Sequence, residues 1–344
     1  MKNGFSNIIA NDDLCSYFDC AIRSKSLAHG YILLGPRGSG KHALARSIAA
    51  ALNCENVGCG GPLPCLECPS CKKIMQDASP DVKFISREED RATLGIDPIR
   101  QIKEDVSFYP NDGDYKIYII EDAHTMTAQA QNAFLLTLEE PPSYAVFILL
   151  CESVENILET VKSRAPILRM RIPSESDCIS YLCENHPAAR SFIKSSPEEF
   201  EQIYKEAGGS IGRILELIGS GEKKQILENR ATVLKLVVAL GEKTLERDFS
   251  EIAASFSQKR DEREKVTAQL SLLQVALRDL LVVKKADEPV TMFFTDIELA
   301  KEIAYEFSAK KLASIIESVE EARLALLRNA NVRLTVINLL SGLI

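Results

Sequence analysis

The chain of 344 residues contains no tryptophan, has no surplus of basic residues and carries no long apolar run. Its 49 Asp and Glu outnumber its 41 Lys and Arg, which argues against a stand-alone nucleic-acid binder. No stretch approaches the roughly 18 unbroken apolar residues of a membrane-spanning helix. Residues 1–5 lack an apolar signal core, so we expect a cytoplasmic protein whose ten cysteines stay reduced. The apolar content of 46% excludes a disordered or low-complexity chain.

The first half of the chain alternates short apolar strands with amphipathic helices. We predict strands at residues 31–34, 82–85, 116–120, 145–150 and 166–170, with helices at 42–52 and 128–138. Strands separated by helices predict a parallel sheet with crossover helices. The chain length suits two or three domains, of which this α/β domain, residues 1–172, is the first.

Strand patterns fade after Pro173, and the rest of the chain is predicted to be helical. Short helices are expected to about residue 221, with breaks at Gly208-Gly209 and at residues 219–221. From Lys223 onward long amphipathic helices follow, most clearly at 267–281, 310–327 and 331–340. The fold class is therefore α/β plus all-α, with a small helical unit at 173–221 and a helical domain at 222–344.

A glycine-rich segment directly after the first strand has the pattern of a phosphate-binding loop. Its glycines let backbone N–H groups turn toward phosphate oxygens, and the helix that follows adds its partial positive charge. The lysine of the pattern would neutralise the β- and γ-phosphates of a bound nucleotide. The segment matches G-x-x-x-x-G-K at seven positions and consists of Gly35, Pro36, Arg37, Gly38, Ser39, Gly40, Lys41 and His42.

The eighth position of this pattern departs from a hydrolytic site. His42 stands where a Ser or Thr hydroxyl ordinarily ligates Mg²⁺, and an imidazole is a poor ligand for that cation. The strand at 116–120 is followed by Glu121-Asp122, the reverse of the Asp-Glu order of a competent site. We therefore expect the loop to hold ATP or ADP, with impaired Mg²⁺ binding and impaired hydrolysis. A water in place of the hydroxyl, with activity only reduced, is the alternative.

Four cysteines between the first helix and the second strand have the spacing of a zinc site. Cys54, Cys65, Cys68 and Cys71 combine two overlapping C-x-x-C steps with one more distant thiol. Four thiolates suit tetrahedral Zn²⁺ and leave no position for catalysis, so the predicted role is structural. Cys59 is an alternative to Cys54 as fourth ligand, and a set of free thiols is the other interpretation.

These motifs, in this order, resemble those of the bacterial sliding-clamp loader subunits of DNA polymerase III. The run LLTLEEPP at 135–142 and the Ser163-Arg164 pair are characteristic, although Ala165 stands where the family carries cysteine. The resemblance continues through residues 209–213 and 278–281 to residues 329–334 and covers essentially the whole chain. It implies an AAA+ domain at 1–172 with a zinc insertion at 54–71, a helical lid at 173–221 and an oligomerising collar at 222–344.

The resemblance also implies roles for single residues and for partner chains. Arg164 would act in trans as an arginine finger in the ATP site of a neighbouring subunit, and Arg213 would be a second-sensor arginine that contacts nucleotide. Glu121 and Asp122 would form a degenerate acidic motif. The implied partners are the gamma/tau and delta subunits, the sliding clamp indirectly, and primer-template DNA through the complex.

Within this family, the departures favour the non-motor member, delta-prime, over the motor ATPase, gamma/tau. They are His42, the inverted Glu121-Asp122, and Cys151 or Glu152 at the position of the motor's γ-phosphate sensor. The shorter length also fits delta-prime. We thus expect a subunit that assists loading of the sliding clamp in DNA replication while its own ATPase is weak or absent. An active motor of the same ring is one alternative, and an unrelated zinc-containing nucleotide sensor is another.

Overall fold

The computed structural model describes residues 4–5, 8–87, 91, 93–220, 222–256, 263–286 and 289–343. The chain divides into two compact units, which we treat separately. Unit 1 comprises residues 1–181 together with 210–213, and unit 2 comprises 182–209 and 214–344. The expected helix break at Gly221 lies outside the described residues.

Unit 1 is built on a parallel sheet of five strands in the order β2-β3-β4-β1-β5. The central strands are apolar and buried on both faces, as parallel sheets require when helices cover both sides. All five strands predicted from the sequence are present, which confirms the parallel α/β fold. The bounds are β1 Gly30–Leu34, β2 Val82–Ile85, β3 Lys116–Ile120, β4 Ala145–Cys151 and β5 Ile167–Arg169.

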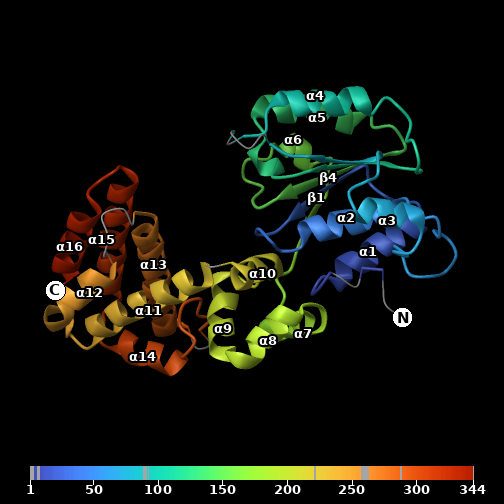
Figure 1. Ribbon diagram of the computed structural model, residues 1–344. Coiled ribbons are helices and arrows are strands. Elements are labelled where there is room, and N and C mark those ends of the chain that lie inside the picture. The colour runs from blue at the N-terminus through green and yellow to red at the C-terminus, as the bar shows by residue number, and fades with distance from the viewer. Residues whose placement is uncertain are drawn as a thin grey trace. The chain divides into compact units, whose positions relative to one another are not determined.

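Helices cover both faces of this sheet (Figure 1). Alternate residues of each central strand point to opposite faces: Leu33 of β1 packs with α1 and α2, whereas Ile32 packs with α4 and α5. The helices of the first face are α1 Asp12–Arg23, α2 Lys41–Leu52 and α3 Pro69–Met75, and those of the second are α4 Ile96–Asp105, α5 Ala128–Glu139 and α6 Glu159–Lys162. The sequence patterns predicted α2 and α5 but missed α1, α3, α4 and α6.

Within its described residues unit 2 consists of helices around one apolar core. Helix α13 (Arg263–Lys285) is central to this core and packs against α11, α14 and α15. By length and composition α13 could cross a membrane, but half of its apolar window is buried inside unit 2, as in a core helix. The other helices from α7 onward are α7 Glu175–Asn185, α8 Pro187–Ser195, α9 Pro197–Glu206, α10 Ile211–Gly219, α11 Glu222–Gly241, α12 Leu245–Phe256, α14 Ile297–Tyr305, α15 Ala309–Leu327 and α16 Val332–Leu343.

Candidate nucleotide-binding loop and cysteine cluster

The glycine-rich loop joins the carboxyl end of β1 to the start of α2. Its first residue is tied to the sheet, because the Gly35 N–H donates to the Cys151 carbonyl at the end of β4 over 3.0 Å. Gly38 and Gly40 have φ angles of 74° and 90°, a left-handed conformation that only glycine adopts without strain. The loop therefore has the backbone needed to turn N–H groups toward an anion at the amino end of α2.

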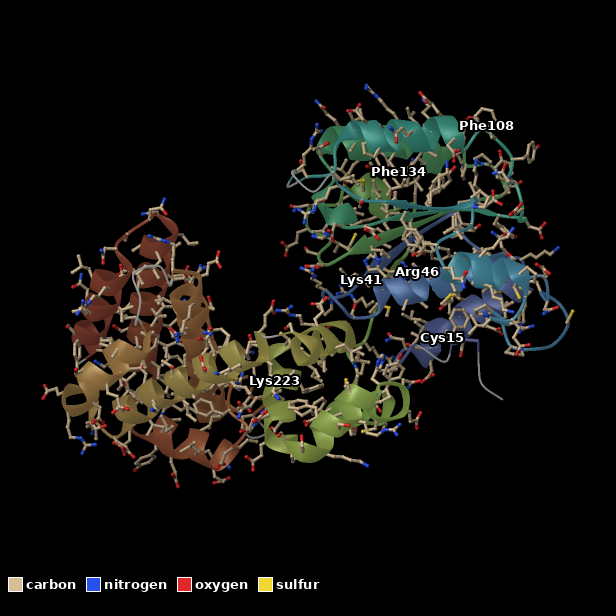
Figure 2. The ribbon with its side chains drawn as sticks, viewed as in Figure 1. Cys15, Lys41, Arg46, Phe108, Phe134 and Lys223 are labelled. Carbon is tan, nitrogen blue, oxygen red and sulfur yellow. The ribbon has the colours of Figure 1, made fainter. Side chains whose placement is uncertain are left out.

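Lys41, labelled in Figure 2 at the start of α2, is buried beneath the loop. Its ammonium donates to the Gly35 carbonyl and, over 2.7 Å, to the Pro36 carbonyl. Burial lowers the pKa of Lys41, and the nearby acid Glu152 acts in the opposite direction. The hydroxyl of Ser39 is buried and has no hydrogen-bond partner among the described residues. An anion in this loop would supply the missing partner of Ser39.

His42 and the two acidic residues lie together at the mouth of the loop. His42 Nδ1 is 3.2 Å from Glu121 Oε1, so the imidazole faces the first carboxylate after β3. Asp122 has a φ of 46°, a left-handed conformation that a short polar residue tolerates better than most. Its carboxylate lies 3.8 Å from the Arg87 guanidinium. The two acids therefore have different partners, and Glu121 is the one engaged by the loop.

The segment of residues 210–213 approaches the same loop within unit 1. A Cβ placed on Gly38 would lie 2.0 Å from the Ser210 hydroxyl, so glycine is required for this contact. The Ser210 hydroxyl accepts from the Arg213 N–H over 3.2 Å and holds the first turn of α10. Arg213 thus begins its helix beside the phosphate-binding loop, and its side chain is exposed.

Cys151 and Glu152 occupy the end of β4 beside Lys41. Burial raises the pKa of the Cys151 thiol to about 12, so this group is a neutral, weak donor at physiological pH. The Glu152 N–H donates to His124 Nδ1 over 3.4 Å. Neither side chain is a strong neutral hydrogen-bond donor of the kind that reads a γ-phosphate.

Arg164 lies directly after α6 and is partly exposed. Its guanidinium forms an ion pair with Glu139 at the end of α5, with Nη2 2.7 Å from Oε1. Nη1 donates to the Thr160 carbonyl over 3.0 Å. The contact from Glu139 to Arg164 joins residues 25 positions apart and was not predicted.

The four predicted zinc ligands come together in space. The Sγ atoms of Cys54, Cys65, Cys68 and Cys71 all lie within 4.8 Å of one another. In a tetrahedral Zn²⁺ site with Zn–S of about 2.3 Å, the sulfur atoms would be about 3.8 Å apart. The observed 3.9 Å between Cys65 and Cys71 Sγ atoms agrees with that spacing. Cys59, the alternative ligand, is exposed and lies outside this group.

The surroundings of the cluster favour the thiolate form of one cysteine, Cys65. Burial acts to raise the pKa of Cys65, but the Cys68 and Glu67 N–H groups and a neighbouring thiol lower it to about 6. Burial raises the pKa values of Cys54 and Cys71. A cation at the centre of the cluster would lower the pKa values of Cys54 and Cys71, because a bound metal deprotonates its thiol ligands. The donor set and spacing therefore fit Zn²⁺.

The cysteine segment is part of the core of unit 1. Cys71 and Leu63 are fully buried, and Cys68 is the N-cap of α3, where its sulfur accepts from the Cys71 N–H. A Cβ on Gly4 would lie 2.0 Å from the Pro64 carbonyl oxygen, so the start of the chain packs closely on this segment. Loss of the cluster is thus expected to disturb the packing beneath α2.

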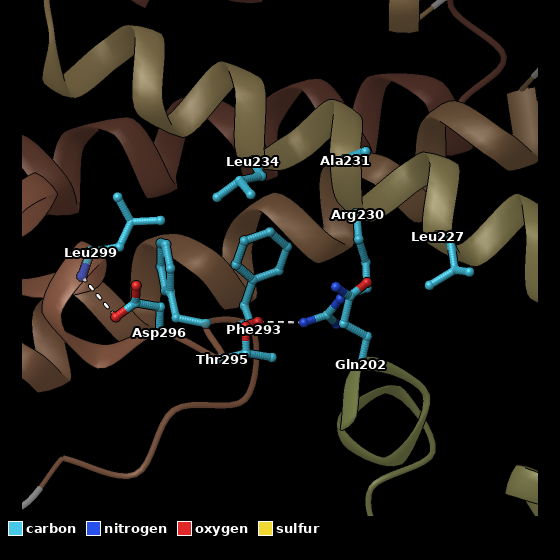
Figure 3. Close-up of a pocket in the computed structure, with 10 residues that line it drawn as sticks. Gln202, Leu227, Arg230, Ala231, Leu234, Phe293, Thr295, Asp296 and Leu299 are labelled. Carbon is cyan, nitrogen blue, oxygen red and sulfur yellow. Dashed lines mark hydrogen bonds between the residues drawn. The ribbon is translucent and has the colours of Figure 1, made fainter. Parts of the chain in front are cut away.

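A separate pocket of about 160 Å³ lies in unit 2 (Figure 3). Arg230 donates to the Phe293 carbonyl, and its guanidinium stacks over the Phe293 ring at 4.8 Å. At Asp296 the carboxylate caps α14 by accepting from the Leu299 N–H. The pocket is smaller than the roughly 300 Å³ or more of most ligand sites, and its polar groups hold the segment at 293–296. We assign it a structural role.

Taken together, the sheet order, the phosphate-binding loop after β1 and the acidic residues after β3 define the class. This is an α/β domain of the AAA+ type, with the strand order and the phosphate-binding-loop pattern of P-loop proteins.

The comparisons with known proteins find similarity to subunits of DNA polymerase III. Residues 10–174 match the family model for DNA polymerase III, delta subunit. The chain is 36% identical over 160 residues to the DNA polymerase III subunit tau of Bacillus subtilis, covering 46% of this chain and 28% of that protein. It is 30% identical over 215 residues to the subunit delta' of Pseudomonas aeruginosa, covering 62% of this chain and 63% of that protein.

The chain is therefore similar to subunits of DNA polymerase III, most extensively in its first half. It spans between 28% and 63% of the length of these two relatives. Among solved structures, a gamma subunit-related protein of Thermotoga maritima is 20% identical with a TM-score of 0.45, covering 95% of this chain and 98% of that chain.

Proposed function

We propose that this chain is a delta-prime-type subunit of the DNA polymerase III clamp loader. It assists the ATP-dependent loading of the sliding clamp onto primer-template DNA and works mainly through partner chains. The partners are the gamma/tau and delta subunits, and the setting is the cytoplasm. The acidic net charge of −8 suits a subunit that does not carry its own DNA-binding face.

The contact between His42 and Glu121 is the observation that carries the non-motor assignment. A hydrolytic site leaves its eighth-position hydroxyl and first carboxylate free for Mg²⁺ and its water shell. Here these two positions hold an imidazole and a carboxylate 3.2 Å apart, so they engage each other. The pair supports binding of a nucleotide at the Gly35–His42 loop, with Arg213 nearby, and weak or absent hydrolysis by this chain.

Arg164 is proposed to complete the ATP site of a neighbouring subunit. Its guanidinium lies on the surface after α6 and is 36% exposed, which leaves it accessible to another chain. A guanidinium beside a transferring phosphoryl group stabilises the charge that develops in the transition state and accelerates hydrolysis by roughly 10³–10⁵ in other arginine-finger systems.

Zn²⁺ is the proposed structural metal at Cys54, Cys65, Cys68 and Cys71. The four sulfur atoms fit its preferred geometry, and a site with all four positions filled has no place for a substrate. The metal would join the end of α2 to the start of α3. In the proposed division of the chain, residues 54–71 form this insertion, 173–221 a lid and 222–344 a collar that holds the ring together.

The assignment is tested by measuring ATP hydrolysis of the purified chain and its assembly with gamma/tau and delta from the same organism. We expect no Mg²⁺-dependent turnover by the chain alone and a defined complex with both partners by size-exclusion chromatography. Robust DNA-stimulated turnover by the chain alone would instead show a motor subunit. Failure to assemble with either partner would favour a nucleotide sensor outside replication.

A further inference from the structure

Glu139 forms an ion pair with the proposed arginine finger, Arg164. We propose that Glu139 is a positioning residue, which holds the Arg164 guanidinium at the subunit surface in the orientation that contacts the transferring phosphoryl group in the ATP site of a neighbouring subunit. This rests on the proposed function of Arg164.

Two contacts on different nitrogens fix the guanidinium. Nη2 donates to Glu139 Oε1 over 2.7 Å, and Nη1 donates to the Thr160 carbonyl over 3.0 Å. Nη1 also lies 3.4 Å from the Ser163 hydroxyl. Because the acceptors come from α5, α6 and the residue before the arginine, the planar group is restrained in both position and rotation.

Both partners are mounted on a rigid part of unit 1. Leu138 and Ala165, the neighbours of Glu139 and Arg164 in the chain, are buried and meet at Gly30 of β1. A Cβ on Gly30 would lie 3.1 Å from Leu138 and 3.3 Å from Ala165. The Arg164 N–H donates to the Val161 carbonyl over 3.0 Å. The ion pair therefore joins two backbones that the core already holds at fixed places, as preorganisation requires.

The contacts of the Arg164 guanidinium leave N–H donors that can bind a phosphate. A guanidinium has five N–H donors, and the acceptors named above use up to three. The Nε–H and the second N–H of Nη2 have no hydrogen-bond partner among the described residues. Two N–H groups are what a bidentate contact to a phosphate needs. Arg164 can thus bind phosphate while Glu139 still holds it.

Helix stability does not account for the acidic residue at this position. Glu139 ends α5, where the partial negative charge of a helix carboxyl terminus disfavours a carboxylate. An exposed ion pair of this kind also adds little to the free energy of unfolding. The contact to Arg164 is the interaction that offsets the unfavourable position.

The test measures steady-state ATP hydrolysis by the fully assembled ring that contains Glu139→Ala in this chain. We expect kcat to fall by about tenfold with KM for ATP unchanged, because a displaced guanidinium weakens transition-state contacts and not ATP binding. Glu139→Gln keeps an acceptor oxygen and should restore most of kcat. Glu140→Ala, at the adjacent exposed residue, is the matched control and should leave kcat unchanged.

A double variant separates this inference from the function on which it rests. Once Arg164→Ala has lowered kcat, adding Glu139→Ala should cause no further loss, because the second residue acts through the first. If Arg164→Ala lowers kcat but Glu139→Ala leaves it unchanged or raises it, Glu139 is no positioning residue and the finger role of Arg164 stands. If Arg164→Ala itself has no effect, the proposed finger fails and the inference falls with it.

Discussion

At the scale of single residues, His42 and Asp122 carry the proposal that this phosphate-binding loop has lost its Mg²⁺ site and kept its fold. His42 faces Glu121 at 3.2 Å, while the glycines and Lys41 keep the geometry that phosphate binding needs. Asp122 lies in a left-handed conformation that suits a short polar side chain. The inverted acidic pair is therefore compatible with the backbone, and the change affects chemistry more than structure.

The substitution His42→Ser tests this account at the loop. We expect the wild-type chain to bind ATP with similar affinity in Mg²⁺ and in EDTA, because the imidazole is a poor ligand for the ion. In His42→Ser a hydroxyl is restored, so ATP should bind about tenfold more tightly with Mg²⁺, equal to about 1.4 kcal/mol. Isothermal titration calorimetry measures both constants.

The control for that measurement is His186→Ser, which removes an imidazole from unit 2, outside the loop. It should leave ATP affinity unchanged in both conditions. If the ATP affinity of His42→Ser is the same in Mg²⁺ and in EDTA, the imidazole is not what prevents metal binding.

At the scale of elements, the cysteine segment between α2 and β2 is an insertion whose fold we expect to depend on metal. Residues 54–71 contain few long apolar residues, and the four sulfur atoms lie within 4.8 Å of one another, where a metal would cross-link the segment. We predict one zinc ion per chain, with Cys68→Ser losing most of it and unfolding at lower temperature. Metal analysis of the purified protein measures the first effect and thermal unfolding the second.

Cys59→Ser is the matched control for this prediction, because Cys59 is exposed and lies in the same segment. It should keep full metal content and the wild-type unfolding temperature. A Cys68→Ser chain with full metal content would refute the ligand set, and metal loss in Cys59→Ser would return Cys59 to it.

Asp81 holds the loop that leads into β3. It is fully buried, and its carboxylate accepts the N–H groups of Asn111, Asp112 and Gly113 over 2.6, 2.7 and 3.0 Å. Asp81→Ala leaves these donors without their acceptor and should reduce the free energy of unfolding by about 3 kcal/mol. Urea unfolding at pH 7 measures the change. Asp19→Ala breaks an exposed ion pair with Arg23 and should cost about 0.5 kcal/mol or less.

The effect of Asp81 should depend on pH. Burial acts to raise the pKa of this carboxyl, but the hydrogen bonds from the loop outweigh it and hold the pKa below its usual value. A depressed pKa in the folded state stabilises the protein fully above the unfolded pKa of about 4. The difference between wild type and Asp81→Ala should therefore shrink as the pH falls below that value. A difference that stays constant under acid would contradict the ionic role.

The sequence predicted the sheet well because its strands are buried on both faces and read as continuous apolar runs. The observed strands Val82–Ile85 and Lys116–Ile120 match the predicted ranges at both ends. Helix α1 was missed although Leu14, Phe18 and Ile22, at helical spacing, mark its buried face. Helix α4 was also missed, although Ile99 and Ile102 are buried on one of its faces.

Side-chain pairs between distant segments could not be predicted from one sequence. The contacts of His42 with Glu121 and of Arg164 with Glu139 depend on which strand ends lie together, and on rotamers that spacing does not reveal. The approach of Ser210 to Gly38 has the same origin. For that contact the sequence offered only two indications. Gly38 belongs to the glycine-rich loop, and Ser210 directly follows the predicted helix break at Gly208-Gly209.

At the scale of the whole molecule, we propose a subunit that keeps a nucleotide-binding loop and gives its catalytic contribution to a neighbouring subunit. The phosphate-binding loop and the cysteine cluster both belong to unit 1, whose sheet also carries Arg164 at its surface. Unit 2 has its own apolar helical core. Loss of Arg164 should therefore affect the ring and leave the isolated chain unchanged.

The most direct measurement is the ATPase rate of the reconstituted ring with Arg164→Ala in this chain. Size-exclusion chromatography first establishes that the variant ring has the same composition as the wild type. The account predicts a lower kcat at unchanged assembly, because one ATP site has lost the guanidinium that stabilises its transition state. A ring that assembles normally and hydrolyses ATP at the wild-type rate would contradict it.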